Sequence, residues 1–182
     1  MQGALGKFRQ GARDGQCHMI YFDEATFCAS PPVQRAWSPI GQTHRTEPAH
    51  HTKRAIIGAL DYTAQKLHYG LFSQTIKRET VIDFLDRVLK QYDGSKPVFI
   101  VIDNARIHHN IPQETLDRWM TAHCAQLLYL PPYSPELNLI EIVWNKAKYH
   151  WRRFVTWTKD SFEAELHELL GGYGTRFQVD FS

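Results

Sequence analysis

The sequence lacks any apolar run that approaches the roughly 20 residues needed to cross a bilayer. Its first residues also lack the continuous apolar core of a signal peptide. We therefore expect a cytoplasmic protein with no membrane contact. There is little excess of charge either, because the formal net charge is only +2. So small an excess does not indicate nucleic-acid binding, and any such prediction must depend on where the charges lie.

Cysteine is scarce, and its spacing excludes two kinds of site. The three cysteines form no CxxC pair, and an odd number without a secretion signal argues against a disulfide framework. Histidine is more common, with ten residues, of which His44, His50 and His51 are close in sequence. Without cysteines at ligand spacing, ordinary loop histidines are the better interpretation than a zinc site.

Length and composition predict one globular domain. The chain has 182 residues, of which 43% are hydrophobic and 22% charged. That length supports one sizeable core but is short for two. Residues 1–16 contain four glycines and show no apolar periodicity, so we predict a flexible lead-in there and a folded domain over residues 17–182.

The apolar pattern predicts a mixed α/β fold. Residues 54–61 and 66–73 are typical of a β-hairpin, and the five consecutive apolar residues 98–102 are typical of a central strand covered on both faces. Shorter strands are expected at residues 18–22 and 127–130, with a plausible one at 33–37, and helices at 81–92, from Pro112 onward, at 138–153 and at 160–170. This order predicts a five-stranded mixed sheet whose first three strands are antiparallel, flanked by helices on both faces.

Two of the expected strands, residues 18–22 and 98–102, are each followed directly by an aspartate, Asp23 and Asp103. If these strands are parallel neighbours, their ends lie about 4.8 Å apart, and the two carboxylates share one edge of the sheet. Taken singly, either aspartate could be an ordinary turn residue. Together they indicate a divalent-cation site, because close anions repel one another and Mg²⁺ prefers carboxylate oxygens.

A third carboxylate would complete a site for two metal ions, and two residues compete for the role. Glu141 follows Asn138 at the spacing of a helix-capping box, and that spacing alone favours a cap over a ligand. Glu136 precedes the expected helix and is typical of a solvated loop acid. Spacing does not choose between them.

Three segments, residues 21–27, 101–108 and 130–144, resemble the three motifs of DDE transposases, and specifically the bacterial insertion-sequence branch of the mariner superfamily. The resemblance extends over residues 17–182, and the third segment, with its Pro-Tyr-Ser-Pro string, is highly specific. It implies an RNase H-like fold in which Asp23, Asp103 and Glu141, rather than Glu136, hold two Mg²⁺ or Mn²⁺ ions. In one departure, Leu139 stands where the family usually has proline.

The resemblance also implies a function, which is metal-dependent DNA cleavage and strand transfer at transposon ends. The implied partners are double-stranded DNA with terminal inverted repeats, a TA-containing target and a second copy of the chain in a homodimer, at the bacterial nucleoid. No helix-turn-helix region of the kind that recognises such repeats precedes Asp23. An inactive remnant that only binds DNA or a partner, or an RNase H-like nuclease without joining activity, therefore remains an alternative.

Basic and aromatic residues alternate between Glu141 and Asp160, without any acidic residue, as in many surfaces that bind nucleic acid. The alternative is that Trp144 and Trp151, seven residues apart, belong to the core and that the lysines are simply solvated. The expected DNA contacts, some of them elsewhere in the chain, are Lys146, Lys148, Arg152, Arg153, His108 and Arg54.

Overall fold

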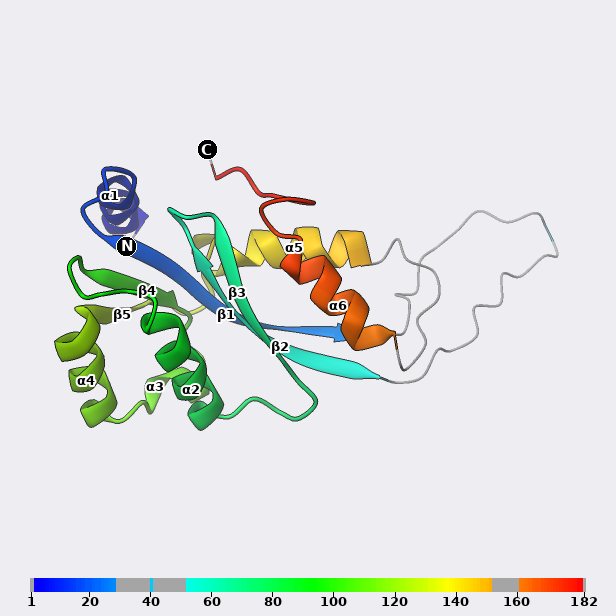
Figure 1. Ribbon diagram of the computed structural model, residues 1–182, viewed down its shortest axis with the longest axis horizontal. Helices are drawn as coiled ribbons and strands as arrows, with labels where there is room; N and C mark the ends of the chain where they lie inside the picture. Colours follow the sequence, from blue (N-terminus) through cyan, green and yellow to red (C-terminus); the bar gives the residue numbers. More distant parts are fainter. Residues whose placement is uncertain (1, 29–39, 41–51, 152–160, 182) are drawn as a thin grey trace.

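A five-stranded mixed sheet forms the centre of the protein (Figure 1). The computed structural model describes residues 2–28, 40, 52–151 and 161–181. The strands lie in the order β3-β2-β1-β4-β5. The first three are antiparallel, and β4 and β5 run parallel to β1, which confirms the predicted sheet. Their bounds are β1 His18–Cys28, β2 Lys53–Asp61, β3 Lys66–Phe72, β4 Val98–Ile102 and β5 Ala125–Tyr129.

Helices cover both faces of this sheet, as expected (Figure 1). On one face lie α2 and α4, and on the other lie α1, α5 and α6. The helices are α1 Gln2–Arg13, α2 Arg78–Leu89, α3 Arg106–His109, α4 Gln113–His123, α5 Ile140–Trp151 and α6 Phe162–Gly171, with a 3-10 turn η1 at Pro135–Leu137. None of the described helices has the length and apolar character required to cross a membrane.

Successive residues of β1 point to opposite faces of the sheet, and this alternation divides the core in two. Ile20 and Phe22 pack with Leu85 of α2. Tyr21 packs on the other side with Ile140 of α5. By the same alternation, a residue next to Asp23 in the strand lies on the α2 side, while Asp23 itself lies on the α5 side.

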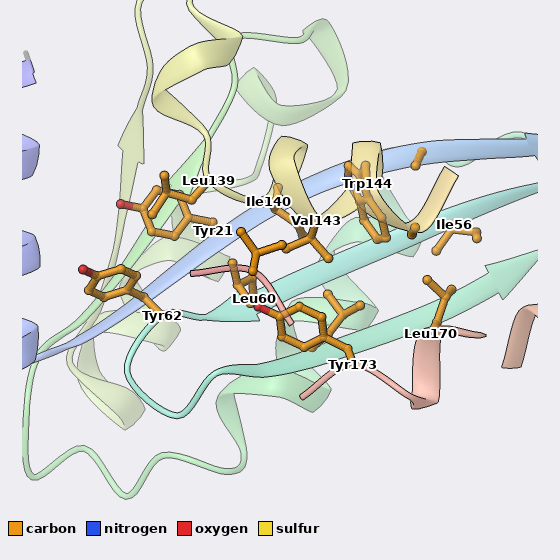
Figure 2. Close-up of a cluster of buried hydrophobic side chains, with 14 of the residues drawn as sticks. Tyr21, Ile56, Leu60, Tyr62, Leu139, Ile140, Val143, Trp144, Leu170 and Tyr173 are labelled. Atoms are coloured by element: carbon orange, nitrogen blue, oxygen red, sulfur yellow. The ribbon is translucent and has the colours of Figure 1, made fainter. Parts of the chain in front are cut away.

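Helix α5 lies close against the sheet (Figure 2). A glycine in β2 makes room for it. Trp144 is buried over Gly58 of β2, and a Cβ added to Gly58 would be 2.4 Å from the Trp144 ring. Gly58 pairs with Asp23 of β1. Helix α5 therefore packs tightly on the sheet next to Asp23.

The N-terminal segment differs from the prediction, since residues 2–13 form α1 rather than a flexible lead-in. Leu5 and Ala12 are buried, and Phe8 lies with its ring centroid 4.5 Å from that of Phe99. Leu5, Phe8 and Ala12 recur at spacings of three and four, which is the stripe of an amphipathic helix. Three glycines within the helix obscured that stripe in the sequence.

Strand β1 is also longer than predicted. It continues through Asp23 to Cys28, because residues 24–28 pair with β2, from Glu24 opposite Ile57 to Cys28 opposite Lys53. Asp23 is thus a residue within a strand and not one that follows it. The predicted strand at 33–37 and the three clustered histidines lie outside the described residues.

Candidate active site

Asp23 and Asp103 lie on neighbouring parallel strands, as the sequence predicts. β1 and β4 pair in parallel, with Tyr21 opposite Val101. Asp23 is two residues beyond Tyr21, and Asp103 is two residues beyond Val101. This register brings both carboxylates to the same level of the sheet.

Both aspartates line one pocket of about 390 Å³, and Glu141 in the first turn of α5 lines it as well. Glu136 is exposed and is not among the lining residues. The pocket therefore brings together the three carboxylates that the resemblance implied. The remaining wall comes from the two strand ends and the loop between β5 and α5: Asn104, Ala105, Leu130, Pro131, Pro132, Tyr133, Ser134, Pro135 and Asn138.

Asn138 connects α5 to β1 instead of capping the helix. Its side-chain Nδ2 donates to the carbonyl of Phe22 at 3.0 Å, and its backbone N–H donates to Pro135 O at 2.9 Å. A capping box would have used that N–H for Glu141, so the capping alternative is wrong. The N–H of Glu141 donates to the Asn138 carbonyl at 3.0 Å, so Asn138 links the residue before Asp23 to Glu141.

The side-chain oxygen of Asn138 is buried and lacks a hydrogen-bond partner within the described protein. Asn138 is only 2% exposed, and it lines the pocket beside Asp23 and Glu141. A buried acceptor without a donor costs about 1–3 kcal/mol. The pocket therefore offers a ready acceptor to a bound water or substrate.

Asp23 is strongly perturbed. Burial raises its pKa, and the nearby carboxylates of Glu141, Glu24 and Asp103 raise it further, to about 8. Burial and like charges both disfavour the ionised form. A cation that neutralises this cluster of carboxylates would therefore strongly favour the ionised form of Asp23.

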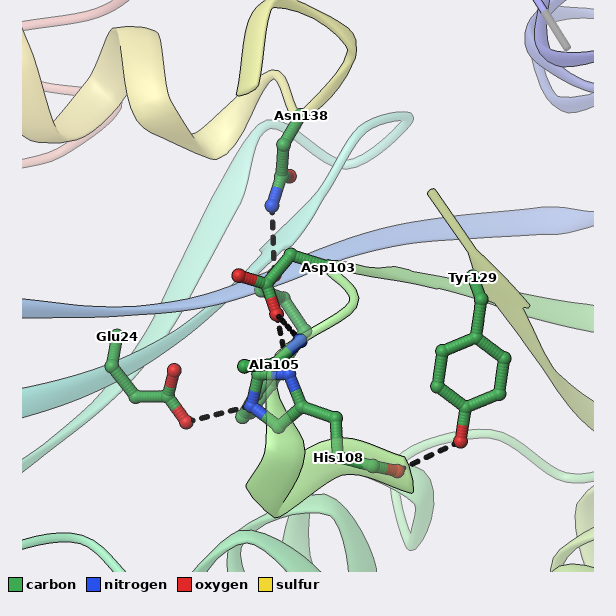
Figure 3. A network of polar contacts seen from close by, with 7 residues as sticks. Glu24, Asp103, Ala105, His108, Tyr129 and Asn138 are labelled. Atoms are coloured by element: carbon green, nitrogen blue, oxygen red, sulfur yellow. Dashed lines mark hydrogen bonds and ion pairs between the residues drawn. The ribbon is translucent and has the colours of Figure 1, made fainter. Parts of the chain in front are cut away.

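The environment of Asp103 favours its ionised form, in contrast to that of Asp23, because a buried histidine forms a hydrogen bond to it (Figure 3). His108 Nδ1 lies 2.6 Å from Asp103 Oδ1, and His108 Nε2 lies 2.9 Å from Glu24 Oε1. The hydrogen bond from His108 holds the pKa of Asp103 below its usual value. Burial lowers the pKa of His108, but the hydrogen bonds and charges of Asp103 and Glu24 outweigh it and raise that pKa to about 9.

His108 is fully buried, so its predicted contact with DNA is wrong. It lies in the short helix α3, and its carbonyl accepts a hydrogen bond of 2.8 Å from the Tyr129 hydroxyl. The ring of Phe22 meets the imidazole edge-on, with centroids 5.5 Å apart. A sequence pattern marked this residue as polar and near Asp103 but could not show that the ring turns inward.

The other expected DNA contacts have mixed surroundings. Trp144 and Trp151 are buried, so they belong to the core, as the alternative held. Lys146 donates to a backbone carbonyl at the surface, and Lys148 lies 6.0 Å from the centroid of a phenylalanine ring. Arg54 forms a 2.5 Å ion pair with Glu163, which occupies its guanidinium. Arg152 and Arg153 lie outside the described residues.

The pocket has the donor chemistry of a magnesium site, since its candidate ligands are carboxylate oxygens. Within the described parts of the chain, no three His, Cys, Asp or Glu side chains are close enough together to hold an ion as they stand. Asp23, Asp103 and Glu141 must therefore draw closer to share one. The like-charge effect on Asp23 and the free Asn138 acceptor both fit a cation with bound water in this pocket.

Glu24 and Tyr133 were not expected from the sequence. Strand alternation would have placed Glu24 on the α2 face, had β1 been extended through its β-forming residues Thr26 and Phe27. Tyr133 lines the pocket and is completely exposed at 101%, with a positive φ of 58°. Tyr133 belongs to the Pro-Tyr-Ser-Pro string of the third motif, but the resemblance gave this tyrosine no role.

Comparison with known proteins gives a consistent result. The DDE superfamily endonuclease family matches residues 18–162. The insertion element IS630 uncharacterized 39 kDa protein of Shigella sonnei is 27% identical over 128 residues, which are 69% of this chain and 36% of that protein. The chain thus spans about a third of this curated relative.

Solved structures of the Mos1 transposase share the fold. A pre-cleavage Mos1 transpososome matches with a TM-score of 0.69 and 16% identity, over 93% of this chain and 52% of that one. The Mos1 mariner paired-end complex with Mn matches with a TM-score of 0.68 and 18% identity, over 96% of this chain and 52% of that one. The corresponding complex with Mg gives 0.69 and 15%, over 95% and 53%. These matches confirm the RNase H-like fold, and this chain spans about half the length of the Mos1 chain.

Proposed function

The chain belongs to the DDE superfamily endonuclease family, and we propose that it is the catalytic domain of a transposase that cuts and joins DNA at transposon ends. One observation carries the proposal. Three carboxylates from distant parts of the chain, Asp23, Asp103 and Glu141, line a single pocket. Nuclease and strand-transfer chemistry at phosphorus uses such carboxylates as metal ligands.

We assign two Mg²⁺ or Mn²⁺ ions to Asp23, Asp103 and Glu141. When bound, such ions lower the pKa of the attacking water or hydroxyl and stabilise the leaving oxygen of an in-line displacement. Mos1 paired-end complexes have been solved with Mn and with Mg, which supports the choice of metal for this fold.

Each carboxylate contributes differently. Asp103 is kept ionised by its hydrogen bond from His108, so it presents negative charge at any ordinary pH. Asp23 is buried and binds its proton tightly, so it is ready to ionise only when a cation arrives. Glu141 sits on a helix that Asn138 fastens to the strand of Asp23, which keeps the third carboxylate next to the first.

The substrate we propose is double-stranded DNA that carries the terminal inverted repeats of an insertion sequence, joined into a TA-containing target. The Mos1 transposase has been solved in a paired-end complex with the left transposon end, and we propose the same kind of DNA partner, and a homodimer on that DNA, for this chain. Lys146 is exposed and Lys148 partly exposed on α5, the helix of Glu141, which supports our assignment of both lysines as contacts to the phosphate backbone.

A cleavage and joining assay tests the proposal. The substrate is a labelled duplex that ends in the inverted repeats flanking the gene, offered with a supercoiled target plasmid and Mg²⁺ or Mn²⁺. We expect cut and joined products from the wild type and none from Asp103→Asn, with DNA affinity and thermal stability retained. Asp180→Asn, a change of the same kind in the C-terminal segment, should keep full activity.

The same assay separates the alternatives. Cut DNA without joined product would indicate an RNase H-like nuclease and refute strand transfer. DNA binding without any cleavage in either metal would indicate an inactive remnant and refute the enzymatic proposal altogether.

A further inference from the structure

Glu24 follows Asp23 directly, yet it cannot share the pocket with it. Successive strand residues point to opposite faces, so Glu24 lies on the α2 and α3 side of β1. Glu24 is not among the residues that line the pocket. Instead, Glu24 contacts the ring of His108, whose other nitrogen contacts Asp103 (Figure 3).

We infer that Glu24 is a positioning residue, which orients the Asp103 carboxylate by holding the imidazole of His108 between them. The inference rests on the proposed function, in which Asp103 is a metal ligand. Its physical basis is the pair of contacts at the two ring nitrogens, 2.9 Å to Glu24 and 2.6 Å to Asp103. A carboxylate that must bind an ion gains affinity when its second oxygen is held by a fixed donor.

Each of the two ring nitrogens of His108 has one carboxylate oxygen as its partner. Because both partners are carboxylates, the doubly protonated ring donates from Nε2–H to Glu24 and from Nδ1–H to Asp103, and the two hydrogen bonds together fix its rotation. Without Glu24, neither the rotation nor the proton position of the ring is defined from that side. Asp103 would then keep its hydrogen bond from the Ala105 N–H, at 3.0 Å, but lose the orientation of its side-chain donor, although His108 itself is unchanged.

The remaining contacts of His108 anchor its backbone and one ring face. The Tyr129 hydroxyl donates to its carbonyl, and the ring of Phe22 meets it edge-on. Neither contact involves a ring nitrogen. Among the described residues, Glu24 is therefore the one group besides Asp103 itself that contacts a ring nitrogen of His108.

Two substitutions separate positioning from simple loss of structure. Glu24→Ala removes the partner of Nε2. Glu24→Gln keeps one, because its amide can either accept from Nε2–H or donate to an unprotonated Nε2, and both arrangements leave Nδ1–H directed at Asp103. If Glu24 is a positioning residue, Glu24→Gln should retain the Nδ1–H signal and the Mn²⁺ affinity that Glu24→Ala loses.

Asp86→Ala is the matched control. Its carboxylate also accepts from a ring nitrogen, Trp119 Nε1 at 2.5 Å, and its side chain is 24% exposed against 20% for Glu24. Asp86 lies on α2, away from the pocket lining. Asp86→Ala removes the hydrogen bond from Trp119 and the ion pair with Arg118, and it leaves the contacts of His108 unchanged.

The experiment measures the ring nitrogens of His108 by NMR and the affinity for Mn²⁺ in all four proteins, with His108→Gln used to assign the signals. We expect Glu24→Ala to lose or broaden the Nδ1–H signal and to bind Mn²⁺ about 10- to 100-fold more weakly, whereas Glu24→Gln and Asp86→Ala remain within about threefold of the wild type. The inference is overturned if Glu24→Ala keeps both the signal and the affinity, or if Asp86→Ala loses as much. Should the wild type bind no Mn²⁺, the metal site of the proposed function fails, and the Nδ1–H signal alone decides the role of Glu24.

Discussion

Trp144 of α5 packs on Gly58 of β2, where an added Cβ would be only 2.4 Å from its ring. Gly58 pairs with Asp23, and Trp144 is one turn along α5 from Glu141. The missing side chain thus allows the helix of the third carboxylate to approach the strand of the first.

Gly58→Ala should push α5 outward. Overpacking in a well-packed core costs about 1–3 kcal/mol, so we expect the free energy of unfolding to fall by about that amount and DNA cleavage to fall more than stability alone explains. Gly6→Ala is a suitable control, because no atom lies within 4 Å of an added Cβ there. In the middle of helix α1 it should raise stability by about 0.5–1 kcal/mol. Urea denaturation checks both signs, and an unchanged Gly58→Ala protein would contradict this account of the α5 contact.

Asp23 predicts a stability that depends on pH in the absence of metal. Its pKa is about 8 in the folded protein, against an ordinary value near 4, so the folded state holds its proton more tightly than the unfolded state. The penalty for ionising Asp23 is absent below about pH 4, grows as the pH rises, and is complete above about pH 8.

Asp23→Asn removes that penalty. In EDTA, we expect the variant to be more stable than the wild type by a few kcal/mol at pH 8, on the order of 1.4 kcal/mol per unit of pKa shift, and equal to it near pH 4. His108 does not confuse the comparison, because it is present in both proteins. Urea titrations at the two pH values measure the difference, and a gap that does not change with pH would show that Asp23 ionises normally.

Tyr133 should be retained for function rather than for stability. Its positive φ of 58° is unfavourable for any residue with a Cβ, and its fully exposed ring makes no packing contribution that would offset the strain. We propose that the ring stacks on a base of bound DNA at the mouth of the pocket. Tyr133→Gly should leave stability unchanged or raise it by up to about 1 kcal/mol while weakening DNA binding. Thermal melting and fluorescence anisotropy give the two readings, and unaltered affinity for DNA would remove Tyr133 from the binding surface.

The charges on α5 predict a salt-dependent contact with DNA. Lys146→Glu with Lys148→Glu should lower DNA affinity and reduce the slope of log affinity against log salt by about 2, because each phosphate contact contributes about 0.9. The same charge change in Lys66→Glu with Lys90→Glu, at the start of β3 and directly after α2, serves as the control. If the two double variants weaken binding equally, the effect comes from net charge and not from a surface on α5.

The sequence predicted the sheet because its strands have strong local patterns. The run of five apolar residues in β4 and the hairpin of β2 and β3 are visible without tertiary information. Helix α1 was missed because the glycines beside Leu5 and Ala12 have poor helix propensity, and burial against the sheet overrides it. A local sequence pattern reflects the helix or strand propensity of a segment, and it does not show which other elements pack against that segment.

For the site, the strand pattern pointed to Asp23 and Asp103, and only the choice of Glu141 over Glu136 came from the resemblance. The spacing of Asn138 and Glu141 favoured a helix cap, whereas the structure uses Asn138 to fasten α5 to β1. The predicted DNA contact of His108 was wrong for the same kind of reason, since its buried ring is hydrogen-bonded to Glu24, 84 residues earlier. Contacts over such separations are set by the fold, which local spacing does not encode.

The central claim is that Asp23, Asp103 and Glu141 close around divalent ions. Anomalous diffraction from crystals of the protein soaked in Mn²⁺ tests it most directly. We predict two peaks in this pocket, about 3.5–4 Å apart, with oxygens of all three carboxylates as ligands. Peaks elsewhere, or a pocket without Mn²⁺ at millimolar concentration, would contradict the claim.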